Sequence, residues 1–213
     1  MDPVILQDLL EGGEYTLLIA AGAWLFAAVF GLLLAILRDL GSRPVSLPVV
    51  GVVTILRSLP ELIILYLVFF GLGSTGLQLS AVVAAIIALG ITDGAFISEY
   101  YRASFLNIPA TQREAGASLG LSRSKVMRLV VLPQTIPFVM PPLLNSFVAL
   151  LKSATLASAI GAMEILARAQ NEMNLTGQIA NVLGIVIVIY IVITFPLTRV
   201  VARLERRVHQ RVA

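Results

Sequence analysis

Five long apolar runs alternate with shorter polar segments along the chain. The runs are Tyr15–Leu37, Val45–Leu72, Leu79–Ile97, Leu129–Ile160 and Ile179–Leu197. Each approaches or exceeds the roughly 20 apolar residues that a helix needs to cross the hydrocarbon core of a bilayer. The pattern therefore predicts an all-α polytopic membrane protein with five transmembrane helices, built as a single domain over residues 1–213.

The composition supports a membrane protein. Hydrophobic residues make up 58% of the chain and charged residues only 13%, whereas soluble domains have roughly 25% charged residues. The mean hydropathy is +0.95 and the isoelectric point is about 9.6. Because the basic residues flank apolar runs, with no interleaved aromatic residues, the charge indicates membrane topology and not a nucleic-acid partner.

Cysteine and histidine, which form many catalytic and metal sites, are almost absent from the sequence. The chain has no cysteine, which excludes disulfides and thiolate chemistry. Its single histidine, His209, lies in a basic tail and is interpreted as a solvated residue. No metal-ligand spacing is present, so we expect no metal site.

The distribution of charge predicts an orientation. Acidic residues precede the first run and basic residues follow the fifth, which places the N-terminus outside and the C-terminus in the cytoplasm. Arg38 and Arg43 then fall inside, and only Arg168 falls in an outer loop. The first residues include no lysine or arginine, so we expect no cleaved signal peptide.

The second run is interrupted by Arg57, Pro60 and Glu61. Ser58 and Glu61 have the spacing of a capping box, which would start a helix at Pro60. Alternatively, one helix continues and Arg57 pairs with Glu61 four residues later. We favour a break near Pro60, and we treat these residues as structural or gate candidates.

A polar segment at about residues 107–132 separates the third and fourth runs. Asn107 is expected to cap a first short helix that Pro109 opens, and Gly120 is expected to end it in the left-handed conformation. Ser122 would cap a second helix from Arg123 onward.

Prolines mark the point where the chain re-enters the membrane. Pro133 and Pro137 are expected to break the second short helix. Further along the fourth run, Pro141 and Pro142 could permit a moving bend or mark a static kink. We therefore take Pro133 and Pro142 as gate candidates.

The first helix of the polar segment has a low-relief face. Ala115, Gly116 and Ala117 are small, and Glu114 places a negative charge beside them. A partner could approach this backbone closely. The alternative, an amphipathic helix lying on the membrane surface, would need a bulky apolar face, and Leu119 is the only large apolar residue available.

The polar segment resembles a known motif. It reads E-A-G-x3-G-x9-V-x-L-P from Glu114 to Pro133, close to the EAA motif of the membrane subunits of ATP-binding-cassette importers, E-A-A-x3-G-x9-I-x-L-P. Gly116 and Val130 are the departures. The resemblance implies a cytoplasmic coupling helix that docks on an ATPase subunit, through residues Glu114, Ala115, Gly116, Ala117, Gly120, Leu121 and Ser122.

Other segments resemble the polar amino acid and opine permeases of that family. They are Arg57–Leu62, Glu99–Arg102, Ile108–Ala115, Leu132–Gln134, Pro141–Asn145 and Leu150–Ser153. The resemblance implies import of a polar amino acid or opine across a bacterial cytoplasmic (inner) membrane. It also implies three kinds of partner: two cytoplasmic ATP-binding subunits, a second permease subunit that is this chain or a related one, and an extracytoplasmic solute-binding protein.

The chain contains no G-x-x-x-x-G-K-[ST] phosphate loop. We therefore do not expect it to be an enzyme or to hold a cofactor. The resemblance implies that ATP and Mg are bound by the partner ATPase.

Polar residues within the apolar runs are candidates for the substrate path, because charged groups are costly to insert. Lys152, Ser153, Thr155 and Ser158 lie close together in the fourth run. The hydroxyls could bond a bound zwitterion or their own helix backbone. Relatives that handle cationic amino acids often have an acidic residue at the position of Ser153, so a basic substrate lacks that support here.

Three acidic residues are further candidates. Asp93 and Glu99 lie towards the inner half of the third run, where they could serve the substrate path, pair with each other or cap a helix. Glu164 lies in the outer loop, where it could attract a cationic group or satisfy a helix end.

Two other functions compete with an importer subunit. A membrane enzyme lacks support, because the sequence shows no serine–histidine pairing and no histidine-rich cluster. A stand-alone secondary transporter of a small polar solute remains the alternative, although such folds commonly show paired repeats, and it would leave the polar segment without a purpose.

Overall fold

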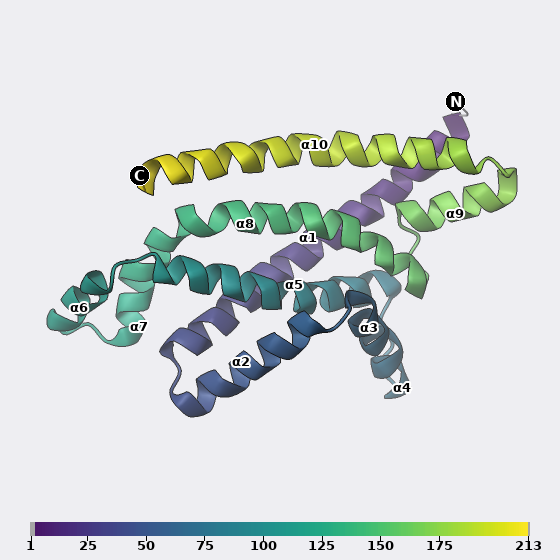
Figure 1. Ribbon diagram of the computed structural model, residues 1–213. Helices are drawn as coiled ribbons and strands as arrows, with labels where there is room; N and C mark the ends of the chain where they lie inside the picture. The colour runs from purple at the N-terminus through teal and green to yellow at the C-terminus, as the bar shows by residue number, and fades with distance from the viewer. Residues whose placement is uncertain (1–2, 213) are drawn as a thin grey trace.

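The computed structural model describes residues 3–212, with side chains as far as residue 206, and that part of the chain is helical without any strand (Figure 1). The expectation for His209 lies outside the described side chains. The α-helices are α1 Pro3–Leu40, α2 Arg43–Ser58, α3 Glu61–Tyr66, α4 Leu72–Ser74, α5 Ala81–Leu106, α6 Ala110–Ser118, α7 Arg123–Val126, α8 Leu132–Ser153, α9 Ile165–Thr176 and α10 Ile179–Val212. Two π-helical turns, η1 Leu67–Gly71 and η2 Met127–Val131, and a 3₁₀ segment, η3 Ala154–Ile160, join them.

Four continuous helical stretches are long and apolar enough to cross a membrane: Pro3–Leu40, Ala81–Leu106, Arg123–Ile160 and Ile179–Arg206. A fifth crossing is possible through a helix pair, Arg43–Ser58 and Glu61–Ser74, which is bent by 105°. The five predicted runs thus appear as four continuous helices and one broken one.

The break in the second run confirms the favoured alternative. Leu59 and Pro60 have extended backbone, with ψ of 140° and 135°, because proline disfavours the α conformation in the residue before it. The predicted capping box is wrong. The Ser58 hydroxyl donates to the Thr54 carbonyl at 2.8 Å, and α3 begins without a side-chain cap.

The predicted helix break at Pro133 and Pro137 is also wrong, because α7, η2 and α8 form one continuous helix. The wide π turn of η2 lies directly before Pro133, where it relieves the clash of the proline ring with the preceding turn. Gln134 and Thr135 donate side-chain hydrogen bonds to the carbonyls of Val130 and Val131, at 2.9 and 2.8 Å. These side-chain bonds supplement the backbone hydrogen bonds of the helix, which prolines weaken because they lack an N–H donor.

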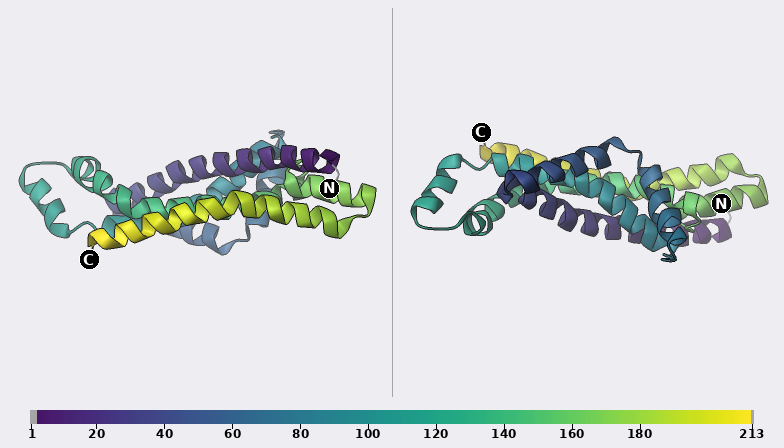
Figure 2. Two further views of the ribbon diagram at one scale, coloured as in Figure 1. Left: turned by 90° about the horizontal axis from the view of Figure 1, so that it is seen from above. Right: turned by 90° about the horizontal axis from the view of Figure 1, so that it is seen from below.

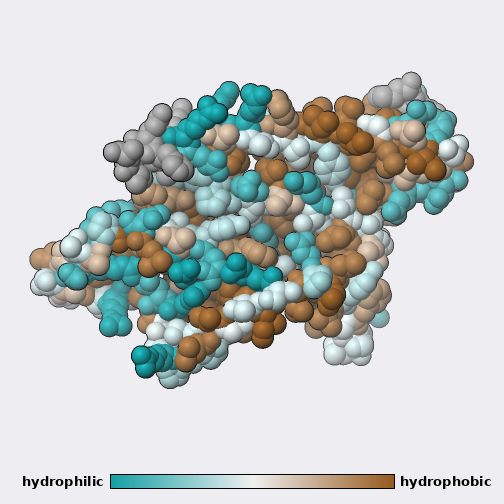
Figure 3. All heavy atoms as spheres, in the orientation of Figure 1, coloured by the Kyte–Doolittle hydropathy of each residue, from teal (hydrophilic) through white to brown (hydrophobic). Residues whose placement is uncertain are grey.

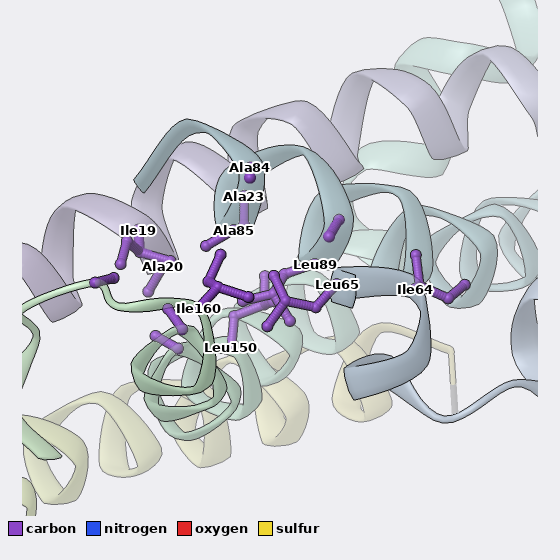
Figure 4. Close-up of a cluster of buried hydrophobic side chains, with 14 of the residues drawn as sticks. Ile19, Ala20, Ala23, Ile64, Leu65, Ala84, Ala85, Leu89, Leu150 and Ile160 are labelled. Atoms are coloured by element: carbon purple, nitrogen blue, oxygen red, sulfur yellow. The ribbon is translucent and has the colours of Figure 1, made fainter. Parts of the chain in front are cut away.

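Helices α1 and α5 pack through small residues. A Cβ atom on Gly31 would lie 2.7 Å from the Gly94 carbonyl oxygen, and one on Gly90 would lie 2.6 Å from the Phe26 ring. The absence of side chains at these glycines therefore lets α1 and α5 approach closely. The main core adds side chains from α3, α8 and η3 to this seam (Figure 4).

The two ends of the bundle differ in what they carry. The N-terminus lies beside α9 at one end, and the C-terminal end of α10 lies near α6 and α7 at the other (Figure 2). On the face in view, hydrophobic side chains are densest over the right-hand half, and hydrophilic ones lie across the left-hand half and at the far right tip (Figure 3). The termini therefore lie at opposite ends of an apolar bundle.

Candidate functional site

Helix α6 lies outside the main bundle, and specific residues define its start and its end. Pro109 is its N-cap residue with ψ 136°, whereas Asn107 ends α5 in helical geometry, so the prediction that Asn107 caps this helix is wrong. Gly120 ends the turn at φ +78°. The Leu121 amide then bonds the Gly116 carbonyl at 3.1 Å, in the manner of a glycine C-cap.

The start of α7 confirms the second predicted cap. The Ser122 hydroxyl accepts a hydrogen bond from the Lys125 amide at 3.4 Å, which satisfies one of the free N–H groups of the first turn. Together, α6 and α7 form the predicted pair of short helices around a glycine turn, and they project from the end of the bundle (Figure 2).

Gly116 lies on the inner face of α6 and not on the predicted contact face. It is buried, and a Cβ atom there would lie 2.9 Å from Cγ2 of Val126 on α7. Its lack of a side chain therefore lets α6 and α7 pack together. Of the predicted low-relief face, only Ala115 and Ala117 are exposed.

The outer surface of this unit is small and partly apolar. Glu114, Ala115, Ala117, Gly120 and Ser122 are exposed, and Leu121 is half-buried. The side chain that stands out most is that of Leu119, which is 82% exposed.

Polar contacts fix α6 to the membrane helices. The Arg113 guanidinium donates two hydrogen bonds to Asp39 at the end of α1, at 2.9 and 3.1 Å, and another to the Phe105 carbonyl of α5 at 3.3 Å. Gln134 of α8 donates to Gln112 at 2.6 Å. A displacement of α6 would therefore act directly on three of the membrane helices.

This anchor was not among the features predicted from the sequence. Asp39 is an acidic residue between basic ones, and that isolation is the signal that could have indicated a specific pairing. Beside the ion pair is a pocket of about 310 Å³ between α1, α6 and the α7–η2 turn, lined in part by Asp39, Arg113, Glu114, Arg123 and Met127.

Glu99 is surrounded by arginines. Its carboxylate accepts from Arg38 of α1 and from Arg102 of α5, both at 2.6 Å, and Arg57 of α2 lies 3.8 Å away. Arg57 thus approaches Glu99. The alternative for the second run required Arg57 to pair with Glu61 instead. These contacts make Glu99 the centre of an ion network that joins three helices.

The four polar candidates of the fourth run lie where α8 gives way to η3. Lys152 is exposed and Ser153 half-buried. The hydroxyl of Thr155 donates to the Lys152 carbonyl, and that of Ser158 to the Thr155 carbonyl, each at 2.7 Å. Both hydroxyls therefore bond the helix backbone, which was one of the two predicted possibilities.

Glu164 satisfies a helix end. Its fully buried side chain accepts hydrogen bonds from the amides of Leu166 and Ala167, both at 2.9 Å. The Ile165 amide donates a hydrogen bond to the Thr16 hydroxyl of α1 at 3.2 Å. Burial raises the pKa of Glu164 to about 7, although these amides favour the charged form.

The substrate-path candidates do not form one site. Glu99 contacts Arg38, whereas the residue after Glu164 contacts Thr16. Those two α1 positions are about 22 residues apart, which is roughly 33 Å along a helix. Glu99 and Glu164 therefore lie towards opposite ends of the bundle.

The end of the bundle near the N-terminus contains an ion cluster that was not predicted from the sequence. Arg168 of α9 pairs with Asp8 and, at 3.2 Å, with Glu11. Asp8 and Glu11 lie on the part of α1 that precedes the apolar run starting at Tyr15. The acidic segment is the part of α1 that holds α9.

Comparison with known proteins places this architecture in a family. Residues 14–210 match the family described as binding-protein-dependent transport system inner membrane component. The probable glutamine ABC transporter permease protein GlnM of Bacillus subtilis is 31% identical over 201 residues, covering 94% of this chain and 93% of that protein. The L-cystine transport system permease protein TcyB of the same organism is 33% identical over 208 residues, covering 96% and 88%.

Solved structures agree. A chain from an amino acid ABC transporter crystallised with histidines has a TM-score of 0.84 and 28% identity, with 94% of both chains covered. A chain of the inward-facing MetNI methionine ABC transporter has a TM-score of 0.77 and 24% identity, covering 98% of this chain and 99% of that one, and supports the fold alone. The chain belongs to the binding-protein-dependent inner membrane component family, the permease subunits of ABC importers.

Proposed function

We propose that this permease subunit imports a polar amino acid or opine, driven by ATPase subunits that dock on α6. The observation that carries the proposal is the projecting α6–α7 unit, which presents the Glu114–Gly120 motif and is tied by Arg113 to the membrane helices. Relatives named for glutamine and L-cystine, and one of Escherichia coli named for histidine, lysine, arginine and ornithine, support an amino acid as the cargo.

The proposal includes the partners that such a subunit needs. Two cytoplasmic ATPase subunits would bind ATP and Mg and carry out hydrolysis, and an extracytoplasmic solute-binding protein would deliver the cargo. A second permease subunit, either this chain or a related one, would complete the transmembrane part. In this scheme, Lys152, Ser153, Thr155 and Ser158 remain candidates for the cargo path.

The orientation follows from the charges. We place the N-terminus outside and the C-terminus in the cytoplasm of a bacterial inner membrane, since Arg199, Arg203 and Arg206 lie on α10 towards the same end as α6. Lysine and arginine are enriched in cytoplasmic segments. The α6–α7 unit is then in the compartment that contains ATP.

A charge reversal tests the coupling role. Glu114→Lys and Gly120→Leu should each lower ATP-driven uptake, and retention of the ATPase on the tagged permease, by roughly tenfold or more, as expected for central residues of an interface. Glu14→Lys is the matched control. Glu14 is also an exposed glutamate, but it lies in the N-terminal half of α1, away from the end of α1 that contacts α6. Membrane insertion should be normal in all three variants.

Two results would contradict the proposal. Unchanged uptake and ATPase retention in the Glu114 and Gly120 variants would show that α6 is not the docking element. Uptake by the permease without any ATPase, driven by an ion gradient, would instead favour the stand-alone secondary transporter.

A further inference from the structure

Glu164 is a buried carboxylate without a cation. Its side chain is fully buried, and among the described residues no lysine or arginine forms a salt bridge with it. Arg168, one turn further along α9, pairs instead with Asp8 and Glu11 of α1. The two amides that Glu164 caps supply hydrogen bonds but no positive side chain. A carboxylate in such surroundings is stabilised by taking up a proton.

The Tyr190 hydroxyl of α10 is a second polar group buried close to Glu164. The charge of Glu164 acts on this hydroxyl, and the Thr16 hydroxyl of α1 also influences it. Among the described residues, however, none lies in hydrogen-bonding geometry with it. Buried hydroxyls in proteins almost always have a partner, so this one indicates a bound species between α1, α9 and α10.

A small cavity lies between these groups. Its volume is about 10 Å³, and its wall includes Thr16 of α1, Ile165 of α9 and Tyr190 of α10. Such a volume holds roughly one water molecule, and a buried water makes about three hydrogen bonds. The Thr16 hydroxyl donates to the Gly12 carbonyl at 3.1 Å and accepts from the Ile165 amide at 3.2 Å. One lone pair of Thr16 and the whole Tyr190 hydroxyl are therefore available to a water.

The same residues determine how α9 sits on α1. The Ile165 amide is bonded to Thr16, and a Cβ atom on Gly12 would lie only 2.8 Å from the Ile165 Cα. If α9 moved off α1, Glu164 would leave its buried position and meet water. Burial raises the pKa of Glu164 from 4.5 to about 7, so the seated helix binds a proton that the released helix gives up. This contribution to seating is complete at low pH and is lost as the pH rises through about 7.

The other charged groups around Glu164 already have partners. Asp8 and Glu11 of α1 pair with Arg168 of α9. Helix α10 contributes Tyr190 to the cavity wall, and α8 contributes the apolar Leu151. Because these groups are common to all the proteins compared below, a pH response that disappears with Glu164 belongs to that residue.

We propose that Glu164, Thr16 and Tyr190 form a proton-binding site that controls the seating of α9 on α1, with one water molecule in the cavity. A proton from the solvent adds to the Glu164 carboxylate when α9 is seated and returns to the solvent when α9 leaves. The water accepts from Tyr190 and from the protonated Glu164 and donates to Thr16, which gives it three hydrogen bonds. The inference goes beyond the proposed function, and only its effect on uptake rests on that function.

The test uses the complete transporter in nanodiscs, with single cysteines introduced by Ala169→Cys or Leu175→Cys, since the chain has no cysteine. Both positions are on α9, where Ala169 is fully buried and Leu175 is 72% exposed. The ratio of the two rates of reaction with a maleimide measures how often α9 leaves α1, because the pH dependence of the thiol itself cancels. The ratio should be about tenfold lower at pH 6 than at pH 8, as a pKa of about 7 against 4.5 requires.

Three substitutions assign this response. Glu164→Gln should make the ratio equal at the two pH values, because glutamine does not titrate. Glu172→Gln is the matched control on α9 and should keep the tenfold change. Tyr190→Phe should raise the ratio at pH 6 and lower the melting temperature, because the water loses a partner. Removal of a hydroxyl that is merely unpaired would instead raise the melting temperature.

A ratio that does not change with pH, or a change that survives Glu164→Gln, would overturn the inference. If Glu164→Gln does not assemble, Tyr190→Phe decides, and a higher melting temperature with an unchanged pH response would overturn it. Amino acid uptake is measured separately and should slow more between pH 8 and pH 6 in the unchanged transporter than in Glu164→Gln. Absence of any ATP-driven uptake would count against the proposed function and leave the maleimide ratios to decide the inference.

Discussion

At the scale of single residues, Glu164 shows how burial and hydrogen bonding oppose each other. Its carboxylate caps α9 through two amides, yet the side chain is fully buried. Burial is the larger effect and raises its pKa from 4.5 to about 7. The folded state then holds more protons than the unfolded state between these two values, so this residue's contribution to stability falls as the pH rises through that window.

The pH dependence of unfolding tests this account. The melting temperature of the purified chain should be lower at about pH 8 than at about pH 5, and Glu164→Gln should remove most of that difference, because glutamine does not titrate. The other titrating groups are shared by both proteins. An identical pH profile in the variant would show that Glu164 has an ordinary pKa.

At the scale of elements, the contact between α1 and α9 depends on one of two adjacent glycines. A Cβ atom on Gly12 would lie 2.8 Å from the Ile165 Cα, which is backbone and cannot rotate away. A Cβ atom on Gly13 would meet nothing within 4 Å. The sequence shows both as glycines in a helix and offers no reason to separate them.

Alanine substitutions should therefore act in opposite directions. Gly12→Ala should lower the melting temperature, because α9 must move away from α1. Gly13→Ala should raise it, since alanine is favoured over glycine in a helix by about 1 kcal/mol. Each variant is the other's control in thermal unfolding of the purified chain. Equal effects would mean that α9 does not pack on Gly12.

At the scale of the whole molecule, the bundle places α9 and α6 at opposite ends (Figure 1). The proposed orientation, with the N-terminus outside, predicts that α9 faces the exterior and α6 the cytoplasm. The chain has no cysteine, so single cysteines report orientation without background. Leu175 on α9 and Leu119 after α6 are well suited, because they are 72% and 82% exposed.

Labelling of intact cells then measures the topology. An impermeant maleimide should modify Leu175→Cys from outside the cell, and Leu119→Cys only after the membrane is opened. The reverse pattern would place α6 outside and would exclude its contact with a cytoplasmic ATPase.

Much of the fold could be predicted because lipid imposes a simple rule. Long uncharged runs must be helical to satisfy their backbone in a bilayer, and the runs in this sequence do appear as helices. Local capping was predictable where one residue determines it, as at Gly120 and Ser122. It failed at Asn107 and Pro133, where the path of the neighbouring helix decides the backbone.

The candidate site was predictable only as residue types. The Glu114–Gly120 motif is visible in the sequence, but the burial of Gly116 against Val126 depends on how α7 folds back. The pairing of Arg113 with Asp39 joins positions 74 residues apart. No local pattern specifies such a partner.

The sequence by itself determined an all-helical membrane chain, its approximate spans and a polar segment with an EAA-like motif, because hydropathy and helix signals are local properties. The tertiary structure decided which charges meet. It gathered three arginines around Glu99, left Asp93 with a serine, and gave Glu164 to a helix end. Long-range electrostatics and burial depend on packing between distant segments, and no local pattern in the sequence specifies those contacts.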